Sequence, residues 1–241
     1  MTPQRLLNDI CKPYDELNAL LAQRFAFEPE LSDITRLAGS IAVSLRHIPE
    51  AVGFTTNMIS NESVANRLII DVADSWKHGS LRDPSRSSKL FVSAMFEWQS
   101  ERGFRFIRNG LAIIHSTLGE HDFLKTALEA THFWIKKLQF NIVWKESGKI
   151  LEAPEEFHPT AFLFYDSKYC ISMKNTRFRF FSRNAEEEMI AIDPAEVRME
   201  IYEKDTAEPK AGFTLRKKEL IEKRQAGIKT WKSGAETSKV Q

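Results

Sequence analysis

The stretch from Trp76 to Gln99, WKHGSLRDPSRSSKLFVSAMFEWQ, decides the fold class because the hydrophobic period changes within it. A helical pattern runs into Gly79, a residue type that favours helix ends. Residues 79–88 are rich in Ser, Gly and Pro and are typical of an exposed loop. Beyond the loop, apolar residues alternate with others, which predicts a strand with one apolar face: Leu90, Val92, Ala94, Phe96 and Trp98.

Three helices are expected before this loop. Apolar residues recur at helical spacing over residues 2–27, with a bend expected at Pro13. A second amphipathic stripe covers residues 34–45. A third helix starts near Asn61 or Ser63, either of which could cap it. Its predicted inward stripe is Val64, Leu68, Val72 and Trp76.

The pair Asn109-Gly110 lies between two apolar runs, residues 104–108 and 111–115. An Asn-Gly pair in this setting predicts a two-residue β-hairpin turn. The same residues also fit a helical stripe, but the glycine inside that stripe disfavours a helix. A further amphipathic helix is expected over residues 122–140.

The remaining chain contains short strand patterns between residues 160 and 202, and their close spacing predicts an antiparallel meander. From Lys210 onward the sequence is strongly basic, which predicts a basic helix with a frayed tail. The predicted fold class is therefore α+β: an N-terminal helical bundle followed by antiparallel strands with a packed helix and a basic C-terminal helix. The expected parts are a helical region with the hairpin and packing helix (1–152), the meander (153–206), and the basic helix with its tail (207–241).

The composition supplies enough apolar residues for a packed core, and the chain as a whole has almost no net charge. Of 241 residues, 42% are hydrophobic, and they include 17 Phe and 5 Trp, while the formal net charge is +1. Cys11 and Cys170 lie far apart and form no Cys-x-x-Cys pair, which fits the reducing cytoplasm. The N-terminus does not resemble a secretory signal, and no apolar run approaches the roughly 20 residues of a membrane helix. We therefore expect a cytoplasmic protein without membrane association.

Several chemical motifs are missing from the sequence. The ten glycines form neither Gly-x-Gly-x-x-Gly nor a Walker-type loop. The six histidines include no His-x-x-x-His pair, and both cysteines stand alone. We therefore expect no cofactor and no metal site.

One candidate site lies at the end of the third helix, where Asp71, Asp74 and His78 are spaced three and four residues apart. This spacing brings side chains onto neighbouring helix faces. A carboxylate next to an imidazole can orient it for general acid–base chemistry. The alternative is that Lys77 and His78 complement the helix dipole while the aspartates are solvated.

The segment 72–81, VADSWKHGSL, resembles an Ala-Asp/Asn-x-aromatic-Lys-His-x-x-Leu pattern of uncharacterised bacterial proteins. In those proteins the pattern closes a helix, and strands and a Trp-containing helix follow. The resemblance covers residues 61–134 and implies no activity, because that group has none established.

A second candidate pair is Arg108 and His115, within RNGLAIIH. Their spacing resembles the Arg-x4–6-His signature of the HEPN ribonucleases, in which Arg and His act together on the scissile phosphate at one end of a helix, across a homodimer. The sequence departs from that family by placing Asn-Gly inside the motif, where a hairpin is expected.

Two predicted strands alternate Arg with Phe. Such strands could hold phosphates on one face and stack bases on aromatic rings. The alternative is an ordinary half-buried strand with Phe inside and Arg in water. The candidate nucleic-acid contacts, including the start of the basic C-terminal segment, are Arg105, Arg108, Arg177, Arg179, Arg216, Lys217 and Lys218.

Together these patterns favour a non-catalytic binding or regulatory protein of bacterial type. A protein partner or a second copy of the chain is expected to bind, and nucleic acid is a further class of partner. The alternative is a nuclease that uses His78 or His115 with a nearby Arg or Asp.

Overall fold

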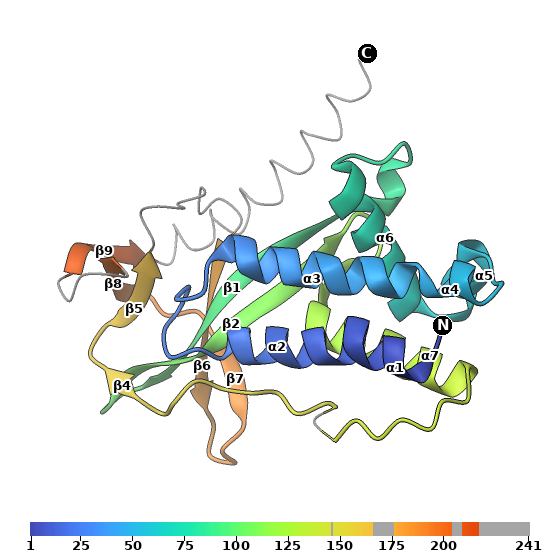
Figure 1. Cartoon of the computed structure of the whole chain (residues 1–241). Coiled ribbons are helices and arrows are strands. Elements are labelled where there is room, and N and C mark those ends of the chain that lie inside the picture. The colour runs from blue at the N-terminus through green and yellow to red at the C-terminus, as the bar shows by residue number, and fades with distance from the viewer. Residues whose placement is uncertain (146, 166–175, 204–208, 217–241) are drawn as a thin grey trace. The chain divides into compact units, whose positions relative to one another are not determined.

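The computed structural model describes residues 1–145, 147–165, 176–203 and 209–216 (Figure 1). Its helices and mixed sheet confirm the α+β class and the N-terminal helices. Among the described helices, none combines the length and the apolar character needed to cross a bilayer.

The first predicted helix is a continuous helical segment made of α1 (Pro3–Leu6), a π-helical turn η1 (Leu7–Cys11) and α2 (Lys12–Leu21). Pro13, which cannot donate a backbone hydrogen bond, lies just after the π-helical turn. The sequence did not predict this π-helical turn, and the bend expected at Pro13 stays a prediction.

The other helices are α3 (Leu31–Arg46), α4 (Ile48–Ala51), α5 (Thr56–Glu62), α6 (Val64–His78) and α7 (Phe123–Lys137). Of these, α3, α6 and α7 lie close to their predicted positions, whereas α4 and α5 were not predicted. The Ser63 side chain accepts a hydrogen bond from Asn66 N and caps α6, while Gly79, with φ of 70°, ends it. Both boundaries of the third predicted helix are confirmed.

The strands form two sheets. They are β1 (Ser88–Gln99), β2 (Gly103–His115), β3 (Gly119–Asp122), β4 (Phe157–His158), β5 (Ala161–Tyr165), β6 (Thr176–Arg183), β7 (Met189–Ile192), β8 (Glu196–Glu203) and β9 (Pro209–Arg216). The larger sheet has the order β3-β2-β1-β6-β7, with β4 paired to β2, and the smaller one has the order β5-β8-β9.

The predicted Asn109-Gly110 hairpin is wrong. Both residues lie inside the continuous strand β2. Asn109 is fully buried, and its Oδ1 accepts a hydrogen bond from Phe27 N at 3.2 Å. A Cβ at Gly110 would lie 3.1 Å from Met95 Sδ, so glycine permits close packing inside the sheet. Asn109 and Gly110 thus make tertiary contacts within the fold, although an Asn-Gly pair is typical of a turn.

The predicted antiparallel meander also needs correction. β5 pairs with β8 in parallel, as Leu163 with Ile201, and β6 runs parallel to β1, as Phe180 with Phe96. The described pairs β2·β4, β6·β7 and β8·β9 are antiparallel. Residues 209–216 form strand β9 instead of the start of the basic helix. The remainder of the predicted helix lies outside the described residues.

The chain divides into two compact units, each assembled from separate stretches. Unit 1 comprises residues 1–21, 32–91 and 111–151, and unit 2 comprises residues 22–31, 92–110 and 152–241. Strands β1 and β2 each begin in one unit and end in the other. The predicted domain ranges 1–152, 153–206 and 207–241 stay a prediction.

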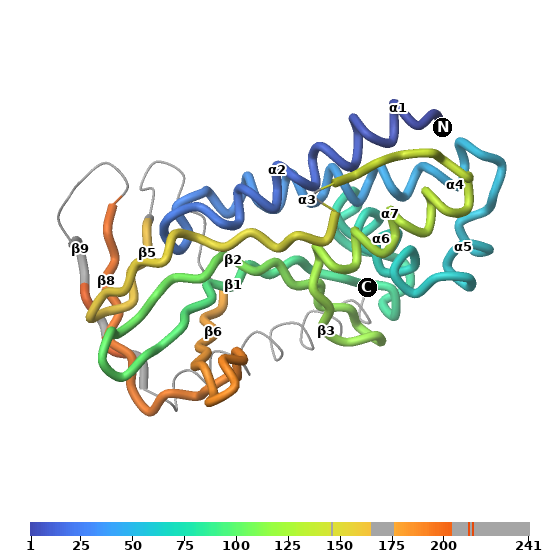
Figure 2. Tube along the Cα trace, turned by 90° about the horizontal axis from the view of Figure 1, so that it is seen from below, coloured from blue at the N-terminus to red at the C-terminus, as the bar shows by residue number. Residues whose placement is uncertain are grey.

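Unit 1 contains a helical core. Trp134 of α7 is fully buried, and its Nε1 donates to Asn66 Oδ1 of α6 at 2.8 Å. Figures 1 and 2 show α2 and α3 side by side in this unit. The two ends of the predicted inward stripe of α6 are exposed, Val64 at 59% and Trp76 at 46%, whereas Leu68 and Val72 between them are buried. The prediction that all four residues face inward is therefore wrong at the helix ends.

Unit 2 contains an aromatic core on its sheet. Phe96 of β1 packs against Phe106 of β2 and Phe180 of β6, each with ring centroids 5.8 Å apart. The predicted apolar face of β1 is confirmed at Val92, Ala94 and Phe96, which are buried, but Leu90 is only half-buried and Trp98 is 40% exposed. The opposite face of the strand is also covered, because Ser93 and Glu97 are buried as well.

Candidate functional site

Two aspartates of α6 lie at the centre of a polar network within unit 1. Asp71 Oδ1 accepts from Arg86 Nε at 2.7 Å, and Asp74 Oδ2 accepts from Arg86 Nη2 at 2.8 Å. Arg46 of α3 donates from Nε to Asp74 Oδ1 at 3.0 Å. His115 of β2 places Nε2 3.1 Å from Asp71 Oδ2. We call these five residues the Asp71 network.

Both ring nitrogens of His115 are occupied. Nδ1 accepts hydrogen bonds from Thr117 N at 3.2 Å and Leu118 N at 3.1 Å, so Nε2 carries the proton that is donated to Asp71. The side chain of His115 has no solvent exposure. In this structure both nitrogens of the imidazole are engaged within the fold, and neither is open to solvent.

The arginines of the Asp71 network remain charged. Burial alone would lower the pKa of Arg86, but its hydrogen bonds to Asp71 and Asp74 outweigh that effect and raise the pKa. The pKa of Arg46 is raised in the same way, against the effect of burial, by hydrogen bonds to Glu50 and Asp74. Two guanidinium groups thus face two aspartates, and the network joins α3, α6, β2 and the loop before β1.

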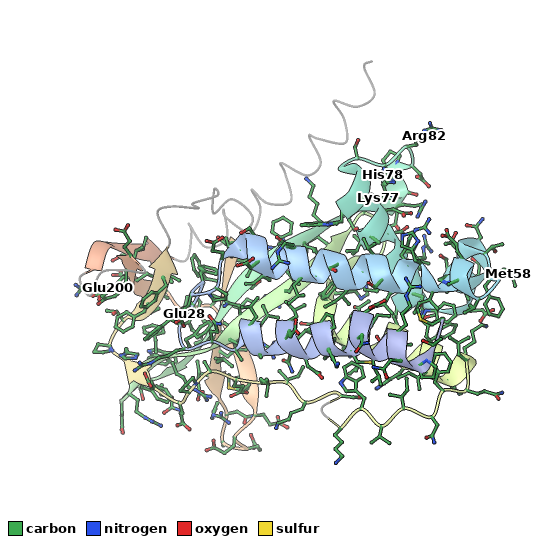
Figure 3. The ribbon with its side chains drawn as sticks, viewed as in Figure 1. Glu28, Met58, Lys77, His78, Arg82 and Glu200 are labelled. Carbon is green, nitrogen blue, oxygen red and sulfur yellow. The ribbon has the colours of Figure 1, made fainter. Side chains whose placement is uncertain are left out.

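The candidate trio of Asp71, Asp74 and His78 is not assembled. The two aspartates come together, but their histidine neighbour is His115, whereas His78 is exposed on the last turn of α6. Figure 3 shows His78 with Lys77 and Arg82 at the C-terminal end of α6 and in the loop after it. Asp74 lies one turn before His78 but is directed toward Arg46 and Arg86.

The structure does not reproduce the arrangement that the HEPN resemblance implies. Arg108 and His115 both lie on strand β2 and not at the end of a helix. Arg108 is buried, and its Nε donates to Asn109 O at 3.2 Å.

A second polar cluster lies in unit 2, around Glu97 of β1. Glu97 is 1% exposed and accepts hydrogen bonds from three side chains: Gln99 Nε2 at 2.8 Å, Arg183 Nε at 2.9 Å and Arg105 Nη1 at 3.2 Å. Arg105 also donates to Glu152 Oε2 at 2.8 Å. We call these five residues the Glu97 cluster. Burial would raise the pKa of Glu97, but the hydrogen bonds and the nearby arginines lower it on balance, so the carboxylate is ionised.

These contacts change the list of candidate nucleic-acid contacts. Arg105 and Arg108 are 7% and 5% exposed and are engaged inside the protein, so they do not present a phosphate-binding face. Arg177 and Arg179 are half-buried on β6, and Arg216 is the last residue of β9. Lys217 and Lys218 lie outside the described residues.

The most exposed large aromatic side chain of unit 1 is Trp76, which is 46% exposed. A Cβ built on Gly39 of α3 would lie 2.5–2.7 Å from three indole atoms, Cε2, Nε1 and Cδ2. These nearly equal distances show that one indole face lies on the backbone of Gly39. Lys77, His78 and Arg82 are exposed at the same end of α6 (Figure 3). We call Trp76 with these three residues the α6 basic end.

Metal chemistry finds no support in the described side chains. Within the part of the chain that the structure describes, no group of three or more His, Cys, Asp or Glu residues could hold a metal ion.

Comparison with known proteins returns no match to a family model, to a curated protein or to a solved structure.

Sequence reasoning missed several residues of these sites. Arg46 and Arg86 lie in segments with no motif, and only the tertiary fold brings them to the aspartates. Glu97 carried a usable signal, since a carboxylate inside the apolar stretch AMFEW needs a cationic partner if both strand faces are covered. Trp76 was recognised as part of α6 but was assigned to the core.

Proposed function

We propose that this chain is a non-catalytic binding protein that contacts single-stranded nucleic acid through the α6 basic end. The observation that carries the proposal is the position of Trp76, whose indole lies with one face on Gly39 and remains 46% exposed. A flat aromatic ring supported from below offers its outer face for stacking of a base. Base–aromatic stacking contributes about 1–3 kcal/mol per base.

The charges around Trp76 favour an anionic partner. Lys77, His78 and Arg82 are exposed on the same end of α6 and can contact phosphates. The nearby aspartates of α6 are neutralised inside the fold by Arg46 and Arg86. The local field at this helix end is thus cationic, although the net charge of the whole chain is only +1.

Asp83 is the one acidic residue in the loop next to Arg82, and its carboxylate has a local role. Its Oδ1 accepts hydrogen bonds from Ser85 N at 3.0 Å and from Ser85 Oγ at 2.7 Å. These bonds hold the pKa of Asp83 below its usual value. The carboxylate stabilises the turn η2 (Pro84–Arg86), and we expect it to weaken phosphate binding by Arg82 only slightly.

The geometry of His115 argues against a nuclease that uses this residue, because both ring nitrogens are engaged within the fold. His78 is exposed and could meet a substrate. Cleavage that depends on His78 is therefore the competing proposal, and it is tested on the same oligonucleotides.

The proposal is tested by fluorescence polarisation of labelled oligo-uridine RNA and oligo-thymidine DNA at low salt. Trp76→Ala should weaken binding by about tenfold, which corresponds to one lost stacking contact. Trp98→Ala is the matched control, because Trp98 is a similarly exposed tryptophan (40%) on β1 of unit 2. Equal effects of the two variants, or no binding by the wild type, would contradict the proposal.

The electrostatic part is tested by the double variant Lys77→Ala/Arg82→Ala. Loss of two phosphate contacts should reduce the slope of log K against log salt by about 1.4 for a single strand. An unchanged slope would show that these cations do not contact the nucleic acid. Cleavage of the oligonucleotides that disappears in His78→Ala would establish the nuclease instead.

A further inference from the structure

Strand β7 (Met189–Ile192) forms an exposed edge of the larger sheet. It is the last strand on the path β3-β2-β1-β6-β7, and no described strand pairs with its outer side. Met189 is 37% exposed, Ile190 is 45% exposed, and Ala191 is exposed as well. An edge strand of this kind presents unpaired backbone groups to which another extended chain can add.

The turn that leads into β7 is stabilised by hydrogen bonds of Asn184. Asn184 Oδ1 accepts from Glu186 N at 3.1 Å and from Glu188 N at 2.8 Å. Asn184 N donates to Glu188 O at 3.0 Å, and Glu187 occupies the left-handed region with φ of 62°. An ordered turn reduces the entropy that β7 would lose when a partner strand binds.

Arg183 connects this hairpin to the interior of unit 2. It pairs with Met189 across β6·β7, and its Nη1 donates to Glu187 O at 3.1 Å. Its Nε donates to the buried Glu97 at 2.9 Å. Arg183, the last residue of β6, therefore links the turn before β7 to a buried carboxylate.

The residues flanking β7 carry only negative charge. Residues 186–196, EEEMIAIDPAE, contain five carboxylates and no basic residue. We propose that β7 binds an extended peptide segment of a partner protein that has a β-branched centre and basic flanks. Backbone pairing with β7 would supply the contact, and the carboxylates would select basic residues on either side.

Charge also argues against a second copy of the chain as the occupant. A second β7 would bring its own Glu186, Glu187 and Glu188 to the same edge. Like charges placed opposite each other across a strand pair are unfavourable. The acidic flanks thus disfavour edge-to-edge dimerisation while they attract a basic segment.

The proposal is tested with two labelled peptides, KKVTIVKK and EEVTIVEE, which share their centre and differ only in flanking charge. The full chain should bind the basic peptide at least about tenfold more tightly, as expected for two or three opposite-charge pairs. The double variant Glu186→Lys/Glu188→Lys, which changes the formal charge of residues 186–196 from −5 to −1, should remove most of this preference. Glu129→Lys, on an exposed position of α7 in unit 1, is the matched charge control and should leave the preference unchanged.

Hydrogen exchange separates strand addition from nonspecific attraction. Bound KKVTIVKK should slow amide exchange within Met189–Ile192, and Trp76→Ala should not alter that protection. Equal affinity for both peptides, unchanged exchange in β7, or dimerisation in place of peptide binding would each overturn the proposal. Because the test uses peptides and the nucleic-acid test uses oligonucleotides, either proposal can fail without the other.

Discussion

His115 Nε2 lies 3.1 Å from Asp71 Oδ2, and both side chains are excluded from solvent. A carboxylate that orients an imidazole is also found in catalytic triads. In a triad the second nitrogen faces the substrate, whereas Nδ1 of His115 faces two backbone N–H groups of the turn after β2. The pair therefore fastens β2 and its turn to α6.

The tautomer of His115 provides the first prediction. Because Nδ1 accepts from Thr117 N and Leu118 N, the ring proton of His115 should lie on Nε2. Long-range proton–nitrogen NMR spectra of the native protein report this state directly, and His115→Gln identifies the signal. A spectrum in which Nδ1 carries a proton would contradict the structure of the Asp71 network.

The pH dependence of stability provides a second prediction, through Glu97. The pKa of Glu97 is lower in the folded chain than its ordinary value of 4.5, so the carboxylate stabilises the fold above pH 4.5 and this contribution is lost as the pH falls through the folded pKa. Glu97→Gln leaves Arg105 buried without its full charge partner and should cost about 3 kcal/mol near neutral pH. Urea unfolding should show the difference from wild type shrinking below pH 4.5.

The control for Glu97 is Glu62→Gln. Glu62 is 43% exposed and pairs with Lys137 on the surface of unit 1, so this change should alter the free energy of unfolding by no more than about 0.5 kcal/mol. A constant difference between wild type and Glu97→Gln across the acid range would mean that Glu97 does not titrate as described.

The support beneath Trp76 provides a third prediction. Gly39→Ala would place a methyl group 2.5 Å from Trp76 Cε2, so the indole must move away from α3. Alanine favours the helix by about 1 kcal/mol relative to glycine, so α3 itself should persist. Fluorine NMR of fluorotryptophan-labelled protein should show a shifted Trp76 signal, and nucleic-acid affinity should fall. Ser40→Ala, an exposed change on the same helix, should have neither effect.

The reactivity of Cys11 provides a fourth prediction. Burial raises the pKa of the Cys11 thiol from 9.0 to about 12, with a further contribution from Asp15. Iodoacetamide near pH 8 should therefore leave Cys11 unmodified in the native protein and alkylate it after unfolding, as peptide mapping by mass spectrometry can show. Because the folded pKa is the higher one, the contribution of this thiol to stability is lost as the pH rises from about 9 toward 12. Rapid native alkylation would contradict its burial in the helical segment.

Features determined by local interactions were predictable from the sequence. The cap at Ser63 and the stop at Gly79 depend on hydrogen bonds and backbone angles within a few residues, and both predictions are confirmed. Asn109 shows the limit of such reasoning, since its side chain bonds to Phe27 N, far away in the chain. A pattern that depends on neighbours in sequence cannot show that contact.

The candidate sites were predictable only in part. Asp71 and His115 were each singled out as candidates, but their pairing requires the approach of β2 to α6, which no spacing indicates. Arg86 lies in a serine-rich loop that is typical of solvent exposure, and its role follows only from that approach. Trp76 fits the apolar stripe of α6, yet its ring is covered on one face by Gly39 of α3 and remains 46% exposed, which the stripe does not indicate.

The interleaved composition of the two units bears on how the chain folds during synthesis. Each unit draws on three separate stretches, so no single pair of truncation sites can excise either one. All residues of unit 1 have been synthesised once residue 151 has left the ribosome. Residues 22–31 and 92–110 belong to unit 2 and cannot complete that unit until residues from 152 onward have been synthesised. During that interval the apolar strand segments assigned to unit 2 are exposed to the cell, so a truncation that ends after residue 151 should depend on chaperones for its solubility.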